Sequence, residues 1–182
     1  MSEDRQLLKA LQRGENAVWR QVYLEYKDDL LTVACSLVGD IDTAEDCLQE
    51  IFVSLASDGC KIRSNLKGYL LSCVVNRARR HLRRRYAQSN CQVNMRSRVS
   101  TPRHDASDPV NVLVRNDQIQ MVTRALEKLP LEQREIVVLR LQGDMKFHQI
   151  AAMLDISLNT AQSRYRYGME KLRQLLSKKE AI

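Results

Sequence analysis

The sequence has few of the residues that interrupt helices. Its 182 residues include only six glycines and three prolines, while 44% of the residues are hydrophobic and 28% are charged. Sheet proteins with many turns need more turn residues than this, so the composition favours long helices over strands. The length fits one ordinary domain or two small ones, and we predict an all-α fold.

The sequence also lacks the spacing of a metal site or a disulfide framework. Its five cysteines are an odd number, lie far apart and include no C-x-x-C pair. No arrangement typical of a catalytic nucleophile and no phosphate-binding glycine loop is present, so we expect no cofactor, no metal and no enzymatic activity. The N-terminus is charged from its third residue, and no run of about eighteen apolar residues occurs. We therefore expect no signal peptide and no membrane span, and we expect the protein to act in the cytoplasm.

Acidic residues are absent from one long stretch in the middle of the chain. Residues 59–104 contain 12 basic and no acidic side chains, whereas residues 1–58 contain 5 basic and 12 acidic ones. Residues 105–182 are nearly balanced, with 12 basic and 10 acidic side chains. A stretch that cannot neutralise itself attracts a polyanion, either nucleic acid or an anionic membrane surface, unless it is simply a solvated run of charge.

The acidic N-terminal part of the chain, residues 1–58, contains a predicted helix that offers a surface for a protein partner. Asp42, with Glu45 three residues later, resembles a capping box and predicts a helix that runs to about Ala56. Its apolar stripe of Ala44, Leu48, Ile51 and Leu55 packs inward. Other faces carry a compact acidic surface next to Phe52 and Val53, made of Glu45, Asp46, Gln49 and Glu50. Polar side chains beside exposed apolar ones suit a protein partner. The alternative is a solvated helix face with acids near its N-terminus.

The helix predicted from Leu66 onward is apolar at its start and cationic at its end. Its later turns contain the polar residues Asn76, Arg77, Arg79, Arg80, Arg83, Arg84 and Arg85, with Tyr69 and Tyr86 nearby. Arginines combined with aromatic rings suit phosphate contacts and stacking on unpaired bases, so we predict binding to single-stranded or melted nucleic acid. A membrane-surface helix would need a broad apolar stripe opposite the arginines, and only Ala78 and Leu82 supply one past Val75.

Residues 87–109 form a polar segment with two prolines and no amphipathic repeat, which predicts a flexible linker. The sequence therefore predicts two small helical domains, at residues 1–86 and 110–182. In the second domain, two helices flank the turn Asp155–Ser157, and Ser157 suits an N-cap; this layout is typical of a helix-turn-helix. The last helix presents side chains that can hydrogen-bond bases and phosphates: Asn159, Thr160, Gln162, Ser163, Arg164 and Arg166. An ordinary helical hairpin with a solvated face is the alternative.

Three segments in this order resemble the extracytoplasmic-function sigma factors of bacterial RNA polymerase. The segments are DTAEDCLQEIFVSL (42–55), NLKGYLLSCVVNRARRHLRRR (65–85) and LEKLPLEQREIVVLRLQGDMKFHQIAAMLDISLNTAQSRYRYGMEKLRQLL (126–176). The resemblance implies a two-domain all-α protein that binds core RNA polymerase and promoter DNA and that often has an anti-sigma factor. The sequence differs from the family pattern at Tyr69, Arg80, Tyr167 and Met169. These differences affect which promoter sequence is recognised rather than the role of the protein.

The resemblance also implies a role for each predicted surface. Glu45, Asp46, Gln49 and Glu50 would meet the clamp helices of the large polymerase subunit. The loop from Ser57 to Asn65 and the helix with Asn76, Arg77, Arg79 and Arg83 would capture the melted upstream strand of the minus-ten element. Thr160, Gln162, Ser163 and Arg164 would read the minus-thirty-five element. A stand-alone helix-turn-helix regulator is the alternative function; an enzyme acting on nucleic acid would need carboxylates near the basic helix, and residues 59–104 have none.

Overall fold

The computed structural model describes residues 2–13, 17–58, 65–91 and 120–177, and these residues are predominantly helical. The helices are α1 (Ser2–Gln12), α2 (Val18–Val38), α3 (Ile41–Asp58), α4 (Leu66–Cys91), α6 (Leu131–Leu141), α7 (Phe147–Leu154) and α8 (Leu158–Ser177). Residues 120–127 are also helical. No strand occurs in these ranges, and the predicted all-α fold is confirmed.

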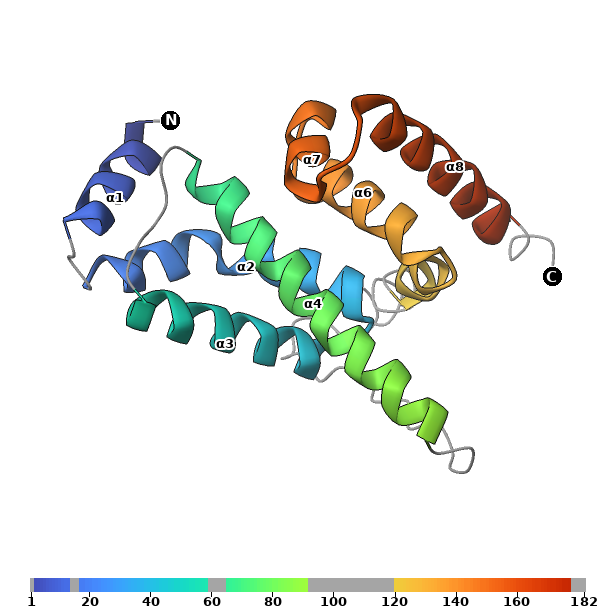
Figure 1. Ribbon diagram of the computed structural model, residues 1–182, viewed down its shortest axis with the longest axis horizontal. Helices are drawn as coiled ribbons and strands as arrows, with labels where there is room; N and C mark the ends of the chain where they lie inside the picture. Colours follow the sequence, from blue (N-terminus) through green and yellow to red (C-terminus); the bar gives the residue numbers. More distant parts are fainter. Residues whose placement is uncertain (1, 14–16, 59–64, 92–119, 178–182) are drawn as a thin grey trace, which may run out of the picture.

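Helices α1–α4 form one group, in which α2 packs against both α3 and α4 (Figure 1). Residues at helical spacing on α2, among them Val22, Leu30 and Val33, are fully buried between these neighbours. The apolar stripe of α3 also points inward, as predicted from Ala44, Leu48, Ile51 and Leu55. Burying such a stripe is the main source of helix stability in water.

The junction between α2 and α3 corrects one prediction. Gly39 ends α2 with a left-handed conformation (φ 92°), and its N–H donates to the Cys35 carbonyl at 2.8 Å. The side chain that caps α3 is Asp40, whose Oδ1 accepts a hydrogen bond from Thr43 N at 2.8 Å. The predicted cap at Asp42 is wrong, because α3 already begins at Ile41 and Asp42 lies within its first turn.

Helix α4 is the longest described helix and extends beyond the predicted end of the first domain. It continues through Cys91, five residues past Tyr86, because the segment AQSNC has no proline or glycine to end it. The remainder of the predicted linker, residues 92–109, lies outside the described residues. The division into domains at residues 86 and 110 stays a prediction.

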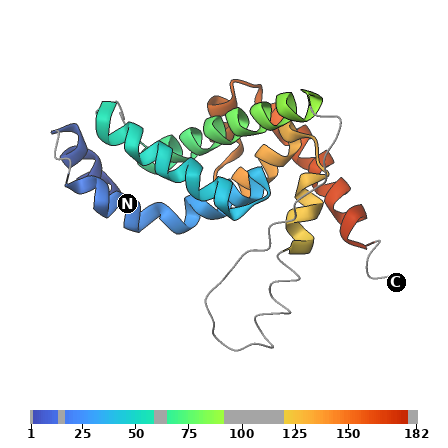
Figure 2. The ribbon, with the colours of Figure 1, turned by 90° about the horizontal axis from the view of Figure 1, so that it is seen from below.

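The middle of helix α6 is buried because the helix lies between α2 and the last two helices of the chain. It contacts α2 on one side and α7 and α8 on the other. Helices α6, α7 and α8 form a second group, which Figure 2 shows close to the end of α2 and to α4. Every residue from Ile136 to Leu139 is at most 1% exposed. The same helix buries Arg134 and Glu135, which are 5% and 2% exposed. Buried charges need partners, and both are described below.

Candidate nucleic-acid and partner surfaces

The predicted partner face of α3 is exposed. Glu45, Asp46, Gln49 and Glu50 all point to solvent, and Val53, next to them, is 67% exposed. Helix α2 adds two apolar side chains that we did not predict, Tyr23 and Leu24, which are 40% and 57% exposed. The Phe52 ring links the two helices, because it packs edge-on against Tyr23 at 5.1 Å between ring centroids. Acidic groups and exposed apolar groups therefore share this side of the molecule.

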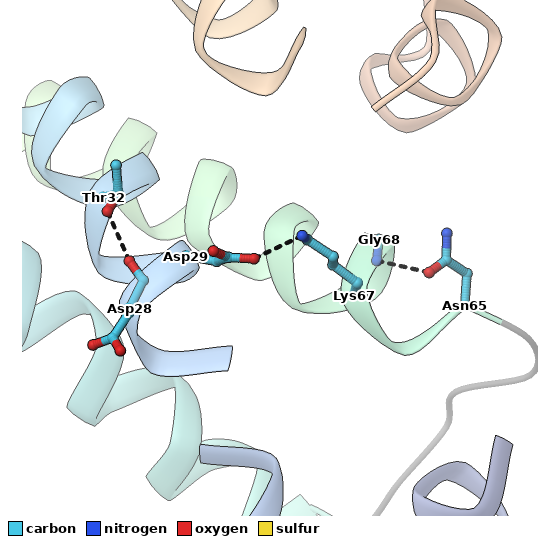
Figure 3. Close-up of polar contacts among 6 residues, drawn as sticks. All are labelled: Asp28, Asp29, Thr32, Asn65, Lys67 and Gly68. Atoms are coloured by element: carbon cyan, nitrogen blue, oxygen red, sulfur yellow. Dashed lines mark hydrogen bonds and ion pairs between the residues drawn. The ribbon is translucent and has the colours of Figure 1, made fainter. Parts of the chain in front are cut away.

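The start of α4 is held by polar contacts on both sides (Figure 3). Asn65 Oδ1 accepts a hydrogen bond from Gly68 N at 3.0 Å, so this predicted nucleic-acid residue also caps the helix. Lys67 Nζ lies 2.7 Å from Asp29 Oδ2 and joins α4 to α2. These contacts fix the direction in which the cationic part of α4 leaves the core.

The predicted nucleic-acid residues of α4 fall into two groups. Asn76, Arg80 and Arg83 are exposed to solvent. Arg77 and Arg79 each contact a carboxylate: Arg77 Nη1 lies 2.5 Å from Glu50 Oε2, and Arg79 binds Glu135. The first pair joins residues that we predicted to meet different partners, the polymerase and the DNA. A basic surface remains on α4, but two of its arginines are already held by acids.

The contact between Arg79 and Glu135 is bidentate and connects α4 to α6. Arg79 Nε donates to Glu135 Oε1 at 2.5 Å, and Nη2 donates to Oε2 at 2.7 Å. These hydrogen bonds raise the pKa of Arg79 despite its partial burial. The parallel arrangement of two N–H groups on two oxygens is the strongest geometry available to this pair of side chains.

Arg134, the neighbour of Glu135, is buried against carbonyl oxygens. Its guanidinium donates to Leu37 O at the end of α2 (2.8 Å) and to Glu127 O (2.6 Å). Burial lowers the pKa of Arg134, and Glu127 acts in the opposite direction. The carbonyls at a helix C-terminus carry partial negative charge, so the end of α2 suits a cation. Arg134 is thus a second polar contact between the two groups of helices.

Helices α7 and α8 form the predicted helix-turn-helix. The turn residue Asp155 is left-handed (φ 54°, ψ 50°), a conformation that aspartate tolerates better than most residues. Ser157 Oγ accepts a hydrogen bond from Thr160 N at 3.0 Å, which confirms Ser157 as the cap of α8. The Phe147 and Tyr165 rings pack edge-on at 5.2 Å across the two helices.

The first turns of α8 present the predicted DNA-reading side chains. Asn159, Gln162 and Arg166 are exposed, whereas Thr160, Ser163 and Arg164 are half-buried. Arg164 Nη2 lies 2.5 Å from Glu132 Oε2 of α6. Arg166 lies over the Tyr167 ring, 5.2 Å from its centroid. Donors and acceptors that suit base edges and phosphates therefore lie along one end of this helix.

Gly168 allows α8 to approach α6. A Cβ atom at this position would lie 2.9 Å from Val137 Cγ2, closer than side chains normally pack. A glycine inside a helix costs about 1 kcal/mol relative to alanine unless close packing requires it, and this contact supplies that requirement.

The arrangement is suited to binding polyanions and a protein partner. Among the described residues, no cluster of three or more histidines, cysteines or acids could hold a metal ion. None of the described helices has the length and apolar character needed to cross a membrane. Sequence reasoning missed Glu132, Arg134 and Glu135; the one available signal was the pair of opposite charges at Arg134 and Glu135, directly before the apolar run from Ile136 to Leu139.

Comparisons with known proteins agree with this description. Residues 22–88 match the family model of sigma-70 region 2, and residues 119–172 match that of sigma-70 region 4. The ECF RNA polymerase sigma-E factor of Escherichia coli K12 is 25% identical over 170 residues, which cover 88% of this chain and 87% of that protein. The ECF RNA polymerase sigma factor SigW of Bacillus subtilis is 22% identical over 179 residues, covering 93% of this chain and 94% of the relative.

Two solved structures have a similar fold. The sigma factor RpoE of Bartonella quintana, solved with the anti-sigma factor NepR, has a TM-score of 0.66 and 25% identity. That match covers 87% of this chain and 96% of the other. CnrH, solved with the cytosolic domain of CnrY, has a TM-score of 0.67 and 22% identity, with 96% and 97% of the two chains covered.

Proposed function

We propose how the surfaces of this chain divide the work of promoter recognition, because the chain belongs to the extracytoplasmic-function sigma factors. It is a transcription initiation factor that binds core RNA polymerase and directs it to promoters. The family is generally non-enzymatic, and we propose that this chain acts by binding alone. Strand separation would then be driven by capture of unpaired bases.

Core polymerase would bind the exposed face of α3. Glu45, Asp46, Gln49 and Glu50 supply its polar part, and Val53 lies beside them. Tyr23 and Leu24 of α2 extend the apolar part. A patch that combines exposed apolar groups with a charged rim has the composition of a protein interface.

The basic face of α4 would capture the melted minus-ten strand. The residues we assign to it are Asn65, Asn76, Arg77, Arg79, Arg80 and Arg83. Two features support the assignment: the absence of acids from residues 59–104 and the exposure of Asn76, Arg80 and Arg83. Arginine side chains bind phosphates and stack on unpaired bases, and both contacts favour single strands.

The start of α8 would read the minus-thirty-five element in the major groove. The residues we assign to it are Asn159, Thr160, Gln162, Ser163, Arg164 and Arg166. The observation that carries this part is the geometry of the turn: left-handed Asp155 and the Ser157 cap present the first turns of α8 at the surface. Recognition helices contact base edges with residues in this position.

An anti-sigma factor is a further proposed partner of this chain. Both similar structures were solved with a protein partner, NepR for RpoE and the cytosolic domain of CnrY for CnrH. We also retain the proposed division into domains at residues 1–86 and 110–182, joined by residues 87–109.

Run-off transcription with purified core polymerase and a promoter library tests the proposed function. The chain should be retained by core polymerase and should direct specific initiation only in its presence. Failure of retention would contradict the assignment of α3. Tight sequence-specific binding to duplex DNA by the chain alone would instead favour the stand-alone regulator.

A further inference from the structure

We propose that Glu135 is a latch: it holds the two groups of helices together in the free chain and shields Arg79 from nucleic acid. The shielding rests on the proposed function, because it assumes that Arg79 contacts the promoter strand. Two carboxylates of α6 bind arginines of the two proposed DNA-binding helices. Glu132 binds Arg164 of α8, and Glu135 binds Arg79 of α4.

The two pairs differ in exposure, and the difference identifies the latch. Glu132 is 66% exposed, so water can replace Arg164 with little loss. The side chain of Glu135 is only 2% exposed, and Arg79 occupies both of its oxygens. As long as α4 and α6 remain in contact, removing Arg79 would leave a buried carboxylate without its cation, which is strongly unfavourable.

Neighbouring contacts show that this ion pair belongs to an interface between the two helix groups. Arg134, which precedes Glu135 on α6, donates a hydrogen bond to Leu37 O at the end of α2. The Leu71 side chain of α4 reaches the backbone just beyond α6, where a Cβ on Gly143 would lie 3.3 Å from Leu71 Cδ1. Separation of the groups would expose Glu135 and Arg134 to water, so neither would remain buried and unpaired.

In the closed arrangement, the two groups of helices are in contact and Glu135 holds Arg79. Closure and nucleic-acid binding therefore compete for the Arg79 guanidinium. Glu135 occupies the Nε and Nη2 edge of the guanidinium, so in the closed arrangement a phosphate can reach only the remaining Nη hydrogens. A phosphate placed at Arg79 in the closed arrangement would also meet the Glu135 carboxylate, a like charge. Molecules in which the pair is broken therefore bind a phosphate at Arg79 more strongly than closed ones, and the apparent affinity of the free chain is reduced when most molecules are closed.

The test compares Glu135→Gln and Arg79→Met with the parent chain in two assays. Small-angle X-ray scattering measures the radius of gyration of the full chain without DNA. Fluorescence anisotropy at low ionic strength measures binding to a labelled random-sequence single strand of about twenty nucleotides. Glu25→Gln is the matched control, because it removes the same charge from an exposed position on α2.

We expect both latch variants to enlarge the chain and Glu25→Gln to leave its radius unchanged. Glu135→Gln should tighten binding to the single strand by at least about threefold more than Glu25→Gln does. Arg79→Met should weaken it, and Glu135→Gln should give no gain in the Arg79→Met background. Circular dichroism checks helicity; should Glu135→Gln fail to fold, Arg79→Met still reports on closure, because it replaces a side chain that is 33% exposed with a good helix former.

An unchanged radius in Arg79→Met, or in a folded Glu135→Gln, would overturn the latch. The shielding would be overturned in two distinguishable ways. Weaker binding by Arg79→Met with no gain from Glu135→Gln would reject the shielding and leave the proposed role of Arg79 intact. Parental binding by Arg79→Met would reject both, since Arg79 would then not contact nucleic acid at all.

Discussion

Arg164 of α8 and Glu132 of α6 form an ion pair of 2.5 Å at the surface of the helix-turn-helix. The side chains are 31% and 66% exposed, so solvent screens their attraction, and such pairs contribute about 0–1 kcal/mol. This energy is small beside a bidentate contact with a base, which is worth about 1–3 kcal/mol of discrimination. The pair therefore holds Arg164 near the start of α8 without preventing it from turning to DNA.

The first prediction concerns Arg164 itself. We expect Arg164→Ala to lower promoter-specific run-off transcription by about tenfold, which corresponds to the loss of one base contact. Retention by core polymerase, measured by co-purification, should stay unchanged. Lys171→Ala removes one positive charge from an exposed position on the same helix and is the control. Equal losses of transcription and of polymerase retention in Arg164→Ala would contradict the assignment.

The second prediction concerns the acidic face of α3. Reversing the charge at Asp46 and Glu50 to lysine should weaken the complex with core polymerase, because both side chains are exposed on the proposed interface. The measurement is the dissociation constant of the complex at two salt concentrations, since rim charges act mainly through screened attraction.

One complication of this test is the ion pair between Glu50 and Arg77. Glu50→Lys would break that pair and place two cations together, so its effect could arise from α4. Asp46→Lys alone avoids the problem, because no hydrogen bond or ion pair to Asp46 is found among the described contacts. An unchanged affinity in Asp46→Lys would remove this residue from the proposed interface.

The helices and their inward faces were predictable because each depends on nearby residues. The stripe of α3 recurs every three to four positions and is buried as expected. Ser157 caps α8 through a contact with Thr160, three residues away. Even the left-handed turn at Asp155 follows from the residue type and its place between two helices.

The contacts of the charged residues were not predictable in the same way. Arg79 and Glu135 are 56 residues apart, and Arg134 and Leu37 are 97 residues apart. A helical pattern shows which face a side chain occupies, but it does not show which distant helix will cover that face. The sequence therefore predicted Arg79 as a nucleic-acid contact without showing that the fold binds it to a buried acid.

The third prediction concerns the contact between Gly168 and Val137. Alanine at position 168 would gain about 1 kcal/mol from helix propensity, but its Cβ would lie 2.9 Å from the buried Val137 Cγ2. Overpacking of a well-filled core typically costs about 1–3 kcal/mol. We expect Gly168→Ala to lower the free energy of unfolding in urea by about 1 kcal/mol net.

Combining Gly168→Ala with a second substitution, Val137→Ala, separates overpacking from other causes of lost stability. It removes the methyl group that the new Cβ would meet, so the double variant should lose less stability than the two single variants together. Additive losses would show that the Gly168 contact does not limit the approach of α8 to α6.

The fourth prediction concerns the buried thiol of Cys47. Burial, then the charge of Glu50, raises the pKa of Cys47 from 9.0 to about 11. In the unfolded chain the thiol ionises near its ordinary pKa, so its contribution to stability is complete below about pH 9. It is lost as the pH rises from 9 towards 11, because the unfolded state then gains a thiolate that the folded state disfavours. The two-unit difference corresponds to about 2 kcal/mol at the upper end of this range.

A comparison with Cys47→Ala isolates this thiol from the tyrosines and lysines that titrate in the same range. Alanine should destabilise the fold at pH 8, because it leaves a small cavity at a fully buried position. The difference in unfolding free energy between parent and variant, measured in urea with reductant present, should shrink as the pH rises from 8 to 11. The parent alone contains the group whose ionisation favours unfolding, so only its curve carries that loss. A difference that stays constant over this range would mean that the Cys47 thiolate is no less stable in the folded chain than in water, and that burial does not set its pKa.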